Sequence, residues 1–129
     1  MITKAELLLN IEIIECTINN FNGLDIMRSI DYLSEIVSLQ STATECVASS
    51  KYLLLEAINN ELDRQAKLLN SEKIAPSIKK LRADAMCREW HYLNEKCERL
   101  ARNISHTIDA TRTKISYYKQ EMENSKYQK

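Results

Sequence analysis

Five basic residues in the second half of the chain have types and spacing that suit anion binding. At about 100° per helical residue, they lie opposite the apolar positions of one expected helix or on the flank of that side. They are Arg88, Arg99, Arg102, His106 and Arg112. Guanidinium groups offer forked donors that match phosphate oxygens, and a histidine adds another donor. The pattern indicates a nucleotide or a nucleic-acid phosphate as a candidate ligand.

Acidic residues on the same helix side support a different interpretation. Glu95, Glu98 and Asp109 lie three or four residues from these basic side chains, which is the spacing at which opposite charges pair on a helix. A side of such pairs is an ordinary solvated surface. Because the acids nearly cancel the bases, we favour this interpretation over the anion site.

Metal binding and catalysis have weaker support in the sequence. Cys87, His91 and Glu95 recur at every fourth residue, and His106 and Asp109 are three apart. Each set supplies at most three ligands from one helix, so we expect neither a metal nor another cofactor. No Ser or Cys lies in a nucleophile motif, and both histidines are expected on exposed sides, so we do not expect an enzyme.

Composition indicates one all-helical domain. The chain has 129 residues with one Gly and one Pro, and so few turn residues leave few places for the chain to reverse direction. Lys+Arg and Asp+Glu are both 18, so no net charge attracts nucleic acid or a membrane surface. The absence of a membrane-length apolar run, of a signal peptide and of CxxC spacing among the four cysteines predicts a cytoplasmic protein with reduced thiols.

We expect a first helix over about residues 4–20 and a second over about 26–70. Thr3 and Glu6 fit a capping box, with Ile2 and Leu7 as a hydrophobic staple, and Asn22-Gly23 suits a helix end. The second helix contains weak helix formers over 38–44. Its apolar positions nevertheless keep one phase: Ile26, Ile30, Leu33, Val37, Val47, Ala48, Leu55, Ile58, Leu62, Ala66 and Leu69. We therefore predict one helix; a break near Ser41 would instead give a four-helix bundle.

The third expected helix spans about residues 77–123, opened by Pro76 or Ser77. Its apolar positions recur every three or four residues, as one helix side requires. They are Met86, Trp90, Leu93, Cys97, Leu100, Ile104, Ile108, Thr111, Ile115, Tyr118 and Met122. The tail at 124–129 is expected to fray.

The second and third helices have matching lengths of roughly 70 Å, which exceeds the width of a compact domain of this size. The sequence therefore predicts an elongated antiparallel helical hairpin with a short N-terminal helix. Pairing about Lys73 places Leu55 against Trp90, Leu62 near Leu81, and a polar layer part-way along. That layer would consist of Gln40, Thr44, Asn103 and Thr107.

A thin hairpin with a short third helix leaves apolar surface uncovered. The first helix has apolar residues around more than half of its circumference, which indicates contacts on two sides. They are Leu7, Leu8, Leu9, Ile11, Ile13, Ile14 and Ile18. Exposed apolar surface costs roughly 25 cal/mol per Å², so we expect a homo-oligomer, with a dimer favoured, and a further protein partner.

One more pattern lies on the third helix. It consists of Glu98, Arg99, Leu100, His106, Asp109, Arg112, Ser116 and Lys119. It resembles the C-terminal helix of small helical proteins encoded in phage and prophage early regions, most of them of unassigned function. The resemblance implies a phage-encoded accessory or anti-defence factor that acts by binding in the cytoplasm of a bacterial host.

Two functions remain open at this point. The first is a non-enzymatic interaction or assembly protein, in which long helix sides contact another protein chain. The second is a binder of a nucleotide or nucleic-acid phosphate through the five basic residues. Only the second predicts an affinity that falls steeply with salt.

Overall fold

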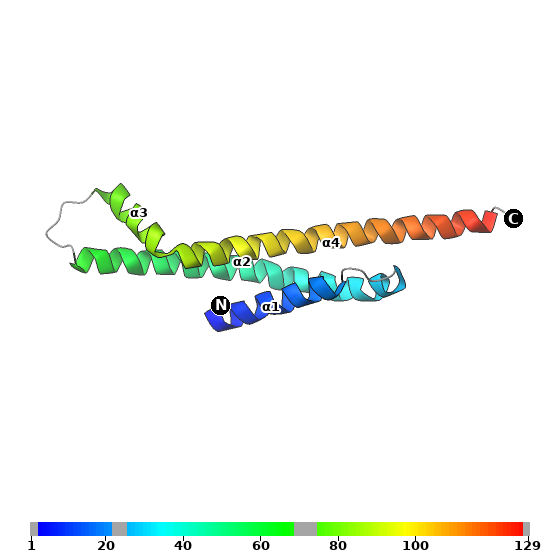
Figure 1. Ribbon diagram of the computed structural model, residues 1–129, viewed down its shortest axis with the longest axis horizontal. Coiled ribbons are helices and arrows are strands. Elements are labelled where there is room, and N and C mark those ends of the chain that lie inside the picture. Colours follow the sequence, from blue (N-terminus) through cyan, green and yellow to red (C-terminus); the bar gives the residue numbers. More distant parts are fainter. Residues whose placement is uncertain (1–2, 22–25, 69–74, 128–129) are drawn as a thin grey trace.

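The computed structural model describes residues 3–21, 26–68 and 75–127 (Figure 1). Within these ranges the chain forms four α-helices and no strand: α1 (Lys4–Phe21), α2 (Ile26–Leu68), α3 (Pro76–Met86) and α4 (Arg88–Tyr127). The prediction of an all-α fold is confirmed. Figure 1 shows an elongated molecule in which α2 and α4 provide the length.

The start of α1 has the predicted capping box. The Glu6 backbone N–H donates to Thr3 Oγ1 over 3.2 Å, and the Thr3 N–H donates to Glu6 Oε2 over 3.3 Å. Each residue thus supplies an acceptor for a donor that the first helical turn leaves without an intrahelical partner. Ile2, Asn22 and Gly23, which the sequence assigned to a staple and a helix end, lie outside the described residues.

Helix α2 runs without a break through Ser41, so the four-helix bundle that depended on a break there is wrong. The weak helix formers of this segment bond to their own helix, because Thr44 Oγ1 donates to the Gln40 carbonyl over 3.0 Å. The hydroxyl of Ser38 likewise donates to the Glu35 carbonyl. These bonds keep the hydroxyl groups satisfied without ending the helix.

The prediction of a single last helix over residues 77–123 is wrong. Pro76 opens a helix as predicted, but α3 ends at Met86, and Cys87 leaves helical geometry with φ −104° and ψ 23°. The Cys87 N–H is shared between the carbonyls of Ala83 and Asp84, at 3.1 and 3.2 Å. This local change of ψ from the usual helical value near −42° redirects the chain, so α3 points away from the line of α4 (Figure 1).

The C-terminal end of α4 also differs from the expectation. Helix α4 continues to Tyr127, so residues 124–127 are helical where the sequence predicted fraying. Figure 1 shows the last turns of α4 extending beyond the start of α2. At the other end of the molecule, Leu81 of α3 is 68% exposed, so it is not buried against Leu62 as predicted.

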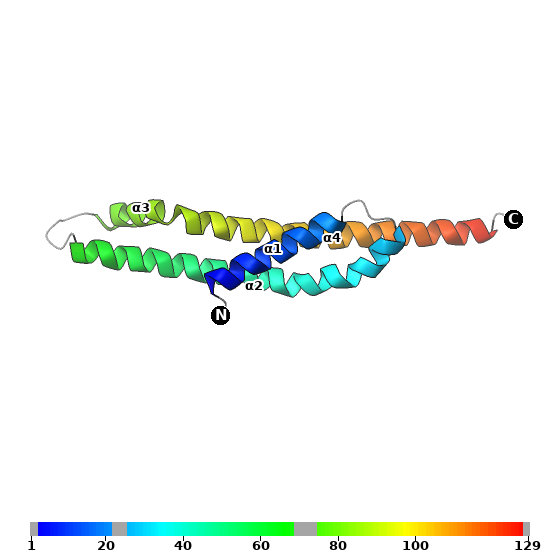
Figure 2. The same ribbon diagram turned by 60° about the horizontal axis from the view of Figure 1, so that its bottom comes forward.

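The core lies where α2, α4 and α1 meet. Figures 1 and 2 show α2 beside α4, with α1 crossing one side of this pair. The buried cluster consists of Leu7, Ile11, Ile14, Ile36, Ala43, Cys46, Leu93, Cys97, Leu100, Ile104 and Ile108. From α1 it takes only one side of the helix. Helix α1 contacts both α2 and α4, and its outer side, with Leu9 and Ile13, remains exposed.

A polar contact lies within the α2–α4 seam, but at other residues than predicted. Asn94 Nδ2 donates to Ser50 Oγ over 2.9 Å, while Gln40, Thr44 and Asn103 are exposed. The predicted layer of Gln40, Thr44, Asn103 and Thr107 is therefore wrong. Because Asn94 bonds to Ser50, the numbers of two residues that face each other across the seam add up to about 144. The predicted pairing about Lys73 required a total of 146.

The side of α2 that faces the core also differs from the expected apolar stripe. Ile30, Val37 and Leu55 are 39%, 37% and 51% exposed. The buried positions are Ser29, Ile36, Ala43, Cys46, Ser49, Ser50, Leu54 and Gln65. Small side chains dominate this set, while Leu33 and Val47 of the expected stripe are partly buried against the core. The packed side of α2 is therefore rotated from the expected stripe and overlaps it in part.

Candidate functional site

All five residues of the expected anion site lie on α4 with exposed side chains: Arg88, Arg99, Arg102, His106 and Arg112. At about 1.5 Å rise per residue, Arg88 and Arg112 are roughly 36 Å apart along the axis. One phosphate cannot contact both. The structure brings together only Arg99, Arg102 and His106, which span about two helical turns.

The ion pairs expected within this side of α4 do not form. Over the described ranges, no ion pair within 4.0 Å joins the five basic side chains to an acid. The acids Glu95, Glu98 and Asp109 are also exposed and are not paired with these bases. The charges on this helix side therefore interact with solvent in the single chain.

A shallow depression next to Arg99 is the closest approach to a cationic pocket. It has a volume of about 220 Å³ and is lined by Lys96, Arg99, Leu100 and Asn103. Lys96 is occupied there by Glu15 of α1, because their Nζ and Oε1 atoms lie 2.9 Å apart. The hydrogen bond to Glu15 raises the pKa of the Lys96 ammonium. This leaves Arg99 as the one cation in the depression that is free to bind an anion among the residues described.

Cysteine and histidine chemistry is limited by burial and spacing. Nowhere in residues 3–21, 26–68 and 75–127 do three or more His, Cys, Asp or Glu side chains gather closely enough to hold a metal ion. His91 Nε2 lies 3.6 Å from Asp84 Oδ1 beside the α3–α4 bend. Cys87 is buried there, and burial, followed by the negative charges of Glu61 and Asp84, raises its pKa.

The two seam cysteines are poor nucleophiles for the same reason. Burial, followed by the proximity of Cys97 and Glu45, raises the pKa of Cys46 to about 11. Burial also raises the pKa of Cys97. Because the thiolate is the reactive form, these thiols remain largely unreactive at neutral pH. Cys16, by contrast, is exposed on α1.

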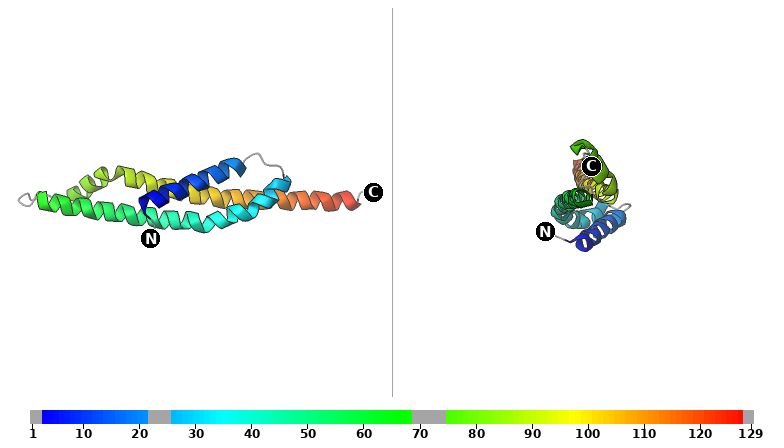
Figure 3. Two further views of the ribbon diagram at one scale, coloured as in Figure 1. Left: turned by 90° about the horizontal axis from the view of Figure 1, so that it is seen from below. Right: turned by 90° about the vertical axis from the view of Figure 1, so that its left-hand side faces the viewer.

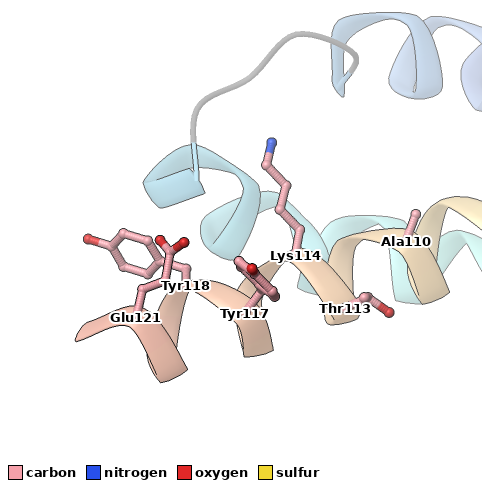
Figure 4. Close-up of a pocket in the computed structure, with 6 residues that line it drawn as sticks. All are labelled: Ala110, Thr113, Lys114, Tyr117, Tyr118 and Glu121. Atoms are coloured by element: carbon pink, nitrogen blue, oxygen red, sulfur yellow. The ribbon is translucent and has the colours of Figure 1, made fainter. Parts of the chain in front are cut away.

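Another depression lies on the C-terminal part of α4 (Figure 4). It has a volume of about 440 Å³ and is lined by Ala110, Thr113, Lys114, Tyr117, Tyr118 and Glu121. Figure 4 shows the Lys114 side chain extending away from α4 and Tyr118 lying next to Glu121. Aromatic rings with a few polar groups suit contact with a protein side chain, and the lining contains no paired acid and base.

Long-range ion pairs join α1 to α4, and no local sequence pattern indicates them. Lys4 Nζ lies 3.3 Å from Glu89 Oε1 and 4.6 Å from the centre of the Trp90 ring. With Lys96–Glu15, these contacts border a groove of about 360 Å³ that Leu8, Tyr92 and Leu93 line. Residues about 80 positions apart share no local pattern, so such pairs become visible only in the folded chain.

Exposed apolar side chains occur on every helix. They are Leu8, Leu9, Ile13, Met27, Ile30, Val37, Tyr52, Leu55, Ile78, Leu81, Met86, Tyr92, Tyr117 and Met122. Single exposed apolar residues are normal on protein surfaces. Sets that share one side of a helix, such as Leu9 with Ile13 or Ile30 with Val37, mark surfaces suited to protein contact.

Comparison with protein-family models, with curated proteins and with solved structures finds no match for the chain. Within the described residues, no helix combines the length and the apolar character needed to cross a membrane. The candidate functional site is therefore judged on geometry and chemistry alone. Of the features above, apolar helix sides and unpaired surface charges are the most extensive.

Proposed function

We propose that this protein acts by binding other protein chains, without catalysis, and that a second copy of the same chain is its first partner. The observation that supports this most strongly is the exposure of large apolar side chains along the molecule, including Leu9 at 57%, Leu55 at 51% and Leu81 at 68%. Covering a half-exposed side chain of this size contributes about 1 kcal/mol. Several such contributions exceed the cost of a modest association.

The architecture that we propose for this function is an elongated antiparallel hairpin, with α2 as one arm, α3 and α4 as the other, and α1 covering part of one side. An extended pair of helices presents more surface per residue than a compact bundle of the same mass. Long helix sides are then available along most of the chain, which suits an assembly protein.

The resemblance of the α4 sequence to phage and prophage proteins supports a setting for this binding. We propose an accessory or anti-defence role in the cytoplasm of a bacterial host. A tagged copy produced in bacteria is expected in the soluble fraction after lysis and centrifugation. Recovery in the membrane pellet would contradict the proposed location.

Light scattering after size exclusion tests the proposed function. A dimer of this 15.0 kDa chain has a mass of about 30 kDa (twice 15.0), and its fraction is expected to rise with protein concentration. A constant mass of one chain at all concentrations, up to near-millimolar protein, would exclude self-association.

Anion binding is a second candidate, favoured by one observation: the side chains of Arg99, Arg102 and His106 form no ion pair within the described chain. A phosphate would not have to displace bound acids. Titration with a single-stranded oligonucleotide tests this proposal. Binding that weakens steeply with salt and is lost in the Arg99→Glu Arg102→Glu double variant would support it, whereas no binding at low salt would exclude it.

A further inference from the structure

One stripe of α4 carries acids and bases in a regular order around a small residue. It consists of Glu98, Arg102, Ser105, Asp109 and Arg112. Successive members are four, three, four and three residues apart, so all five lie on one side of the helix. We call this set the α4 charge stripe.

The charge stripe lies on the side of the α2–α4 pair that α1 does not cover. The buried seam of α4 is centred on Cys97 and Ile104. At about 100° per residue, Ser105 lies about 90° past this centre. Lys96 lies about 90° before it, and Lys96 contacts Glu15 of α1. The end view in Figure 3 likewise shows α1 on one side of the pair.

The same uncovered side includes apolar residues of α2, with the exposed polar residues Ser41 and Thr44 between them. Because α2 runs antiparallel to α4, positions that follow its buried seam lie on the same side as Ser105. Ile30, Val37 and Ala48 occupy these positions and are exposed. Leu33, Val47 and Ala101 are half-buried between these residues and the charge stripe. We call this surface, with its half-buried apolar residues and its edge of charges, the uncovered face.

The charges of the stripe are exposed and form no ion pair within the part of the chain that the structure describes. The side chains concerned are those of Glu98, Arg102, Asp109 and Arg112. The ion pairs that this part of α4 does make involve α1 on the other side. The stripe is thus available to a partner.

The order of the charges matches a second copy of the same stripe in the antiparallel direction. From Glu98 to Arg112 the signs are negative, positive, neutral at Ser105, negative and positive. When two copies of the stripe lie antiparallel, each charged residue therefore faces a residue of opposite charge in the partner. Glu98 and Arg112 are both seven residues from Ser105, about 10.5 Å. Arg102 and Asp109 are three and four residues away, a difference of about 1.5 Å that side chains can span.

Helix α2 fits the same two-fold axis. The Asn94–Ser50 hydrogen bond makes Leu39 level with Ser105 across the seam. Ile30 and Ala48 are each nine residues from Leu39. In the antiparallel arrangement, Ile30 therefore meets the partner's Ala48, a large side chain against a small one. Such alternation lets two helix sides interdigitate.

We infer that two copies of this chain associate through the uncovered face, antiparallel about Ser105, with Glu98 facing the partner's Arg112. Arg102 then faces the partner's Asp109. The inference rests on the self-association in the proposed function and specifies its surface and direction. Apolar burial along α2 supplies most of the affinity, while exposed ion pairs of roughly 0–1 kcal/mol each select the antiparallel direction.

Charge reversal tests the inference through the dissociation constant of the dimer, measured by sedimentation at about 50 mM salt, where screening is weak. Arg102→Glu or Asp109→Arg alone makes two facing pairs repulsive, and each is expected to raise the constant about tenfold or more. An equimolar mixture of the two variants is expected to dimerise nearly as well as the unchanged chain. In a mixed dimer, reversed position 102 faces reversed position 109, and the two unchanged positions also attract.

Arg99→Glu is the matched control, because it reverses the same charge three residues away, outside the stripe. It is expected to change the dissociation constant less than about threefold. Circular dichroism checks that all variants keep their helices. A dimer that tolerates Arg102→Glu, or a mixture that fails to recover, overturns this inference and leaves the proposed self-association in place. An unchanged chain that stays monomeric overturns both.

A second measurement does not depend on charge. In Ser105→Cys, the new thiols of the two copies lie level at the two-fold axis, and a short bismaleimide is expected to join them into a covalent dimer. Arg99→Cys and the unchanged chain, which contains the exposed Cys16, are the controls. Equal cross-linking of Ser105→Cys and these controls would overturn the inference.

Discussion

The two sides of the α2–α4 pair differ in how their charges and apolar groups are used. On one side, α1 buries Leu7, Ile11 and Ile14 and forms the Lys4–Glu89 and Lys96–Glu15 ion pairs with α4. On the other side, no described helix covers the apolar residues of α2 and the α4 charge stripe. Charges of α4 next to α1 thus pair across helices, whereas those of the charge stripe remain exposed.

Removing a buried apolar side chain of α1 should have the largest effect on stability. Ile14 is fully buried, so Ile14→Ala is expected to lower the free energy of unfolding by about 2–5 kcal/mol, through lost apolar burial and a cavity. Ile13→Ala is the matched control, because Ile13 is 46% exposed on the outer side of the same helix. Urea denaturation measures both. Equal losses would mean that the covered side does not depend on these contacts.

The polar contact inside the seam provides the next test. In Ser50→Ala, the amide of Asn94 loses its acceptor in a partly buried place, and a loss of about 1–2 kcal/mol is expected. Asn103→Ala, at an exposed position of α4, should change stability by less than about 0.5 kcal/mol. The urea denaturation midpoints of the two variants, compared with that of the unchanged chain, measure these losses of stability. If Ser50→Ala is neutral, this hydrogen bond does not stabilise the α2–α4 register.

The burial of Cys46 in the seam predicts that the stability of the protein depends on pH. The folded pKa of Cys46 is raised to about 11 from an ordinary 9.0. Above pH 9 the unfolded chain releases this proton while the folded chain keeps it, so stability is full below pH 9 and falls as pH rises toward 11. Urea midpoints at several alkaline pH values should fall less steeply in Cys46→Ala. Identical slopes would contradict a buried neutral thiol.

The ion pairs on the covered side should have the smallest effect. Lys96→Gln removes the 2.9 Å contact with Glu15, but both side chains are more than a third exposed, so the expected loss is about 0.2–1 kcal/mol. Lys119→Gln, an exposed position of α4, serves as the control. The comparison uses urea denaturation at low salt. A loss above about 2 kcal/mol would show that charges, and not apolar contacts, hold α1.

Local patterns predicted the beginnings and the continuity of helices well. Thr3 and Glu6 form the expected capping box, Pro76 opens α3, and the constant apolar phase of α2 favoured the unbroken helix that the structure has at Ser41. Each of these features depends on residues within one or two turns. Such short-range information is present in the sequence itself.

The errors arose where distant contacts decide the structure. No Gly or Pro marks the bend at Cys87, and the apolar phase from Met86 to Trp90 continues across it, so sequence alone predicts one helix there. On α2 the strongest apolar line was taken as the packed side, whereas small residues such as Ser29 and Ala43 face the core. Charge pairing was expected within α4, but Lys96 pairs with α1.

Small-angle X-ray scattering, recorded at a protein concentration where the mass has doubled, tests the central claim most directly. Side-by-side antiparallel pairing about Ser105 predicts a particle of twice the mass whose greatest length, on the order of 80 Å for the α3–α4 arm, increases by only about 10 Å. A particle that doubles in length, or a mass that never exceeds that of one chain, would contradict the account.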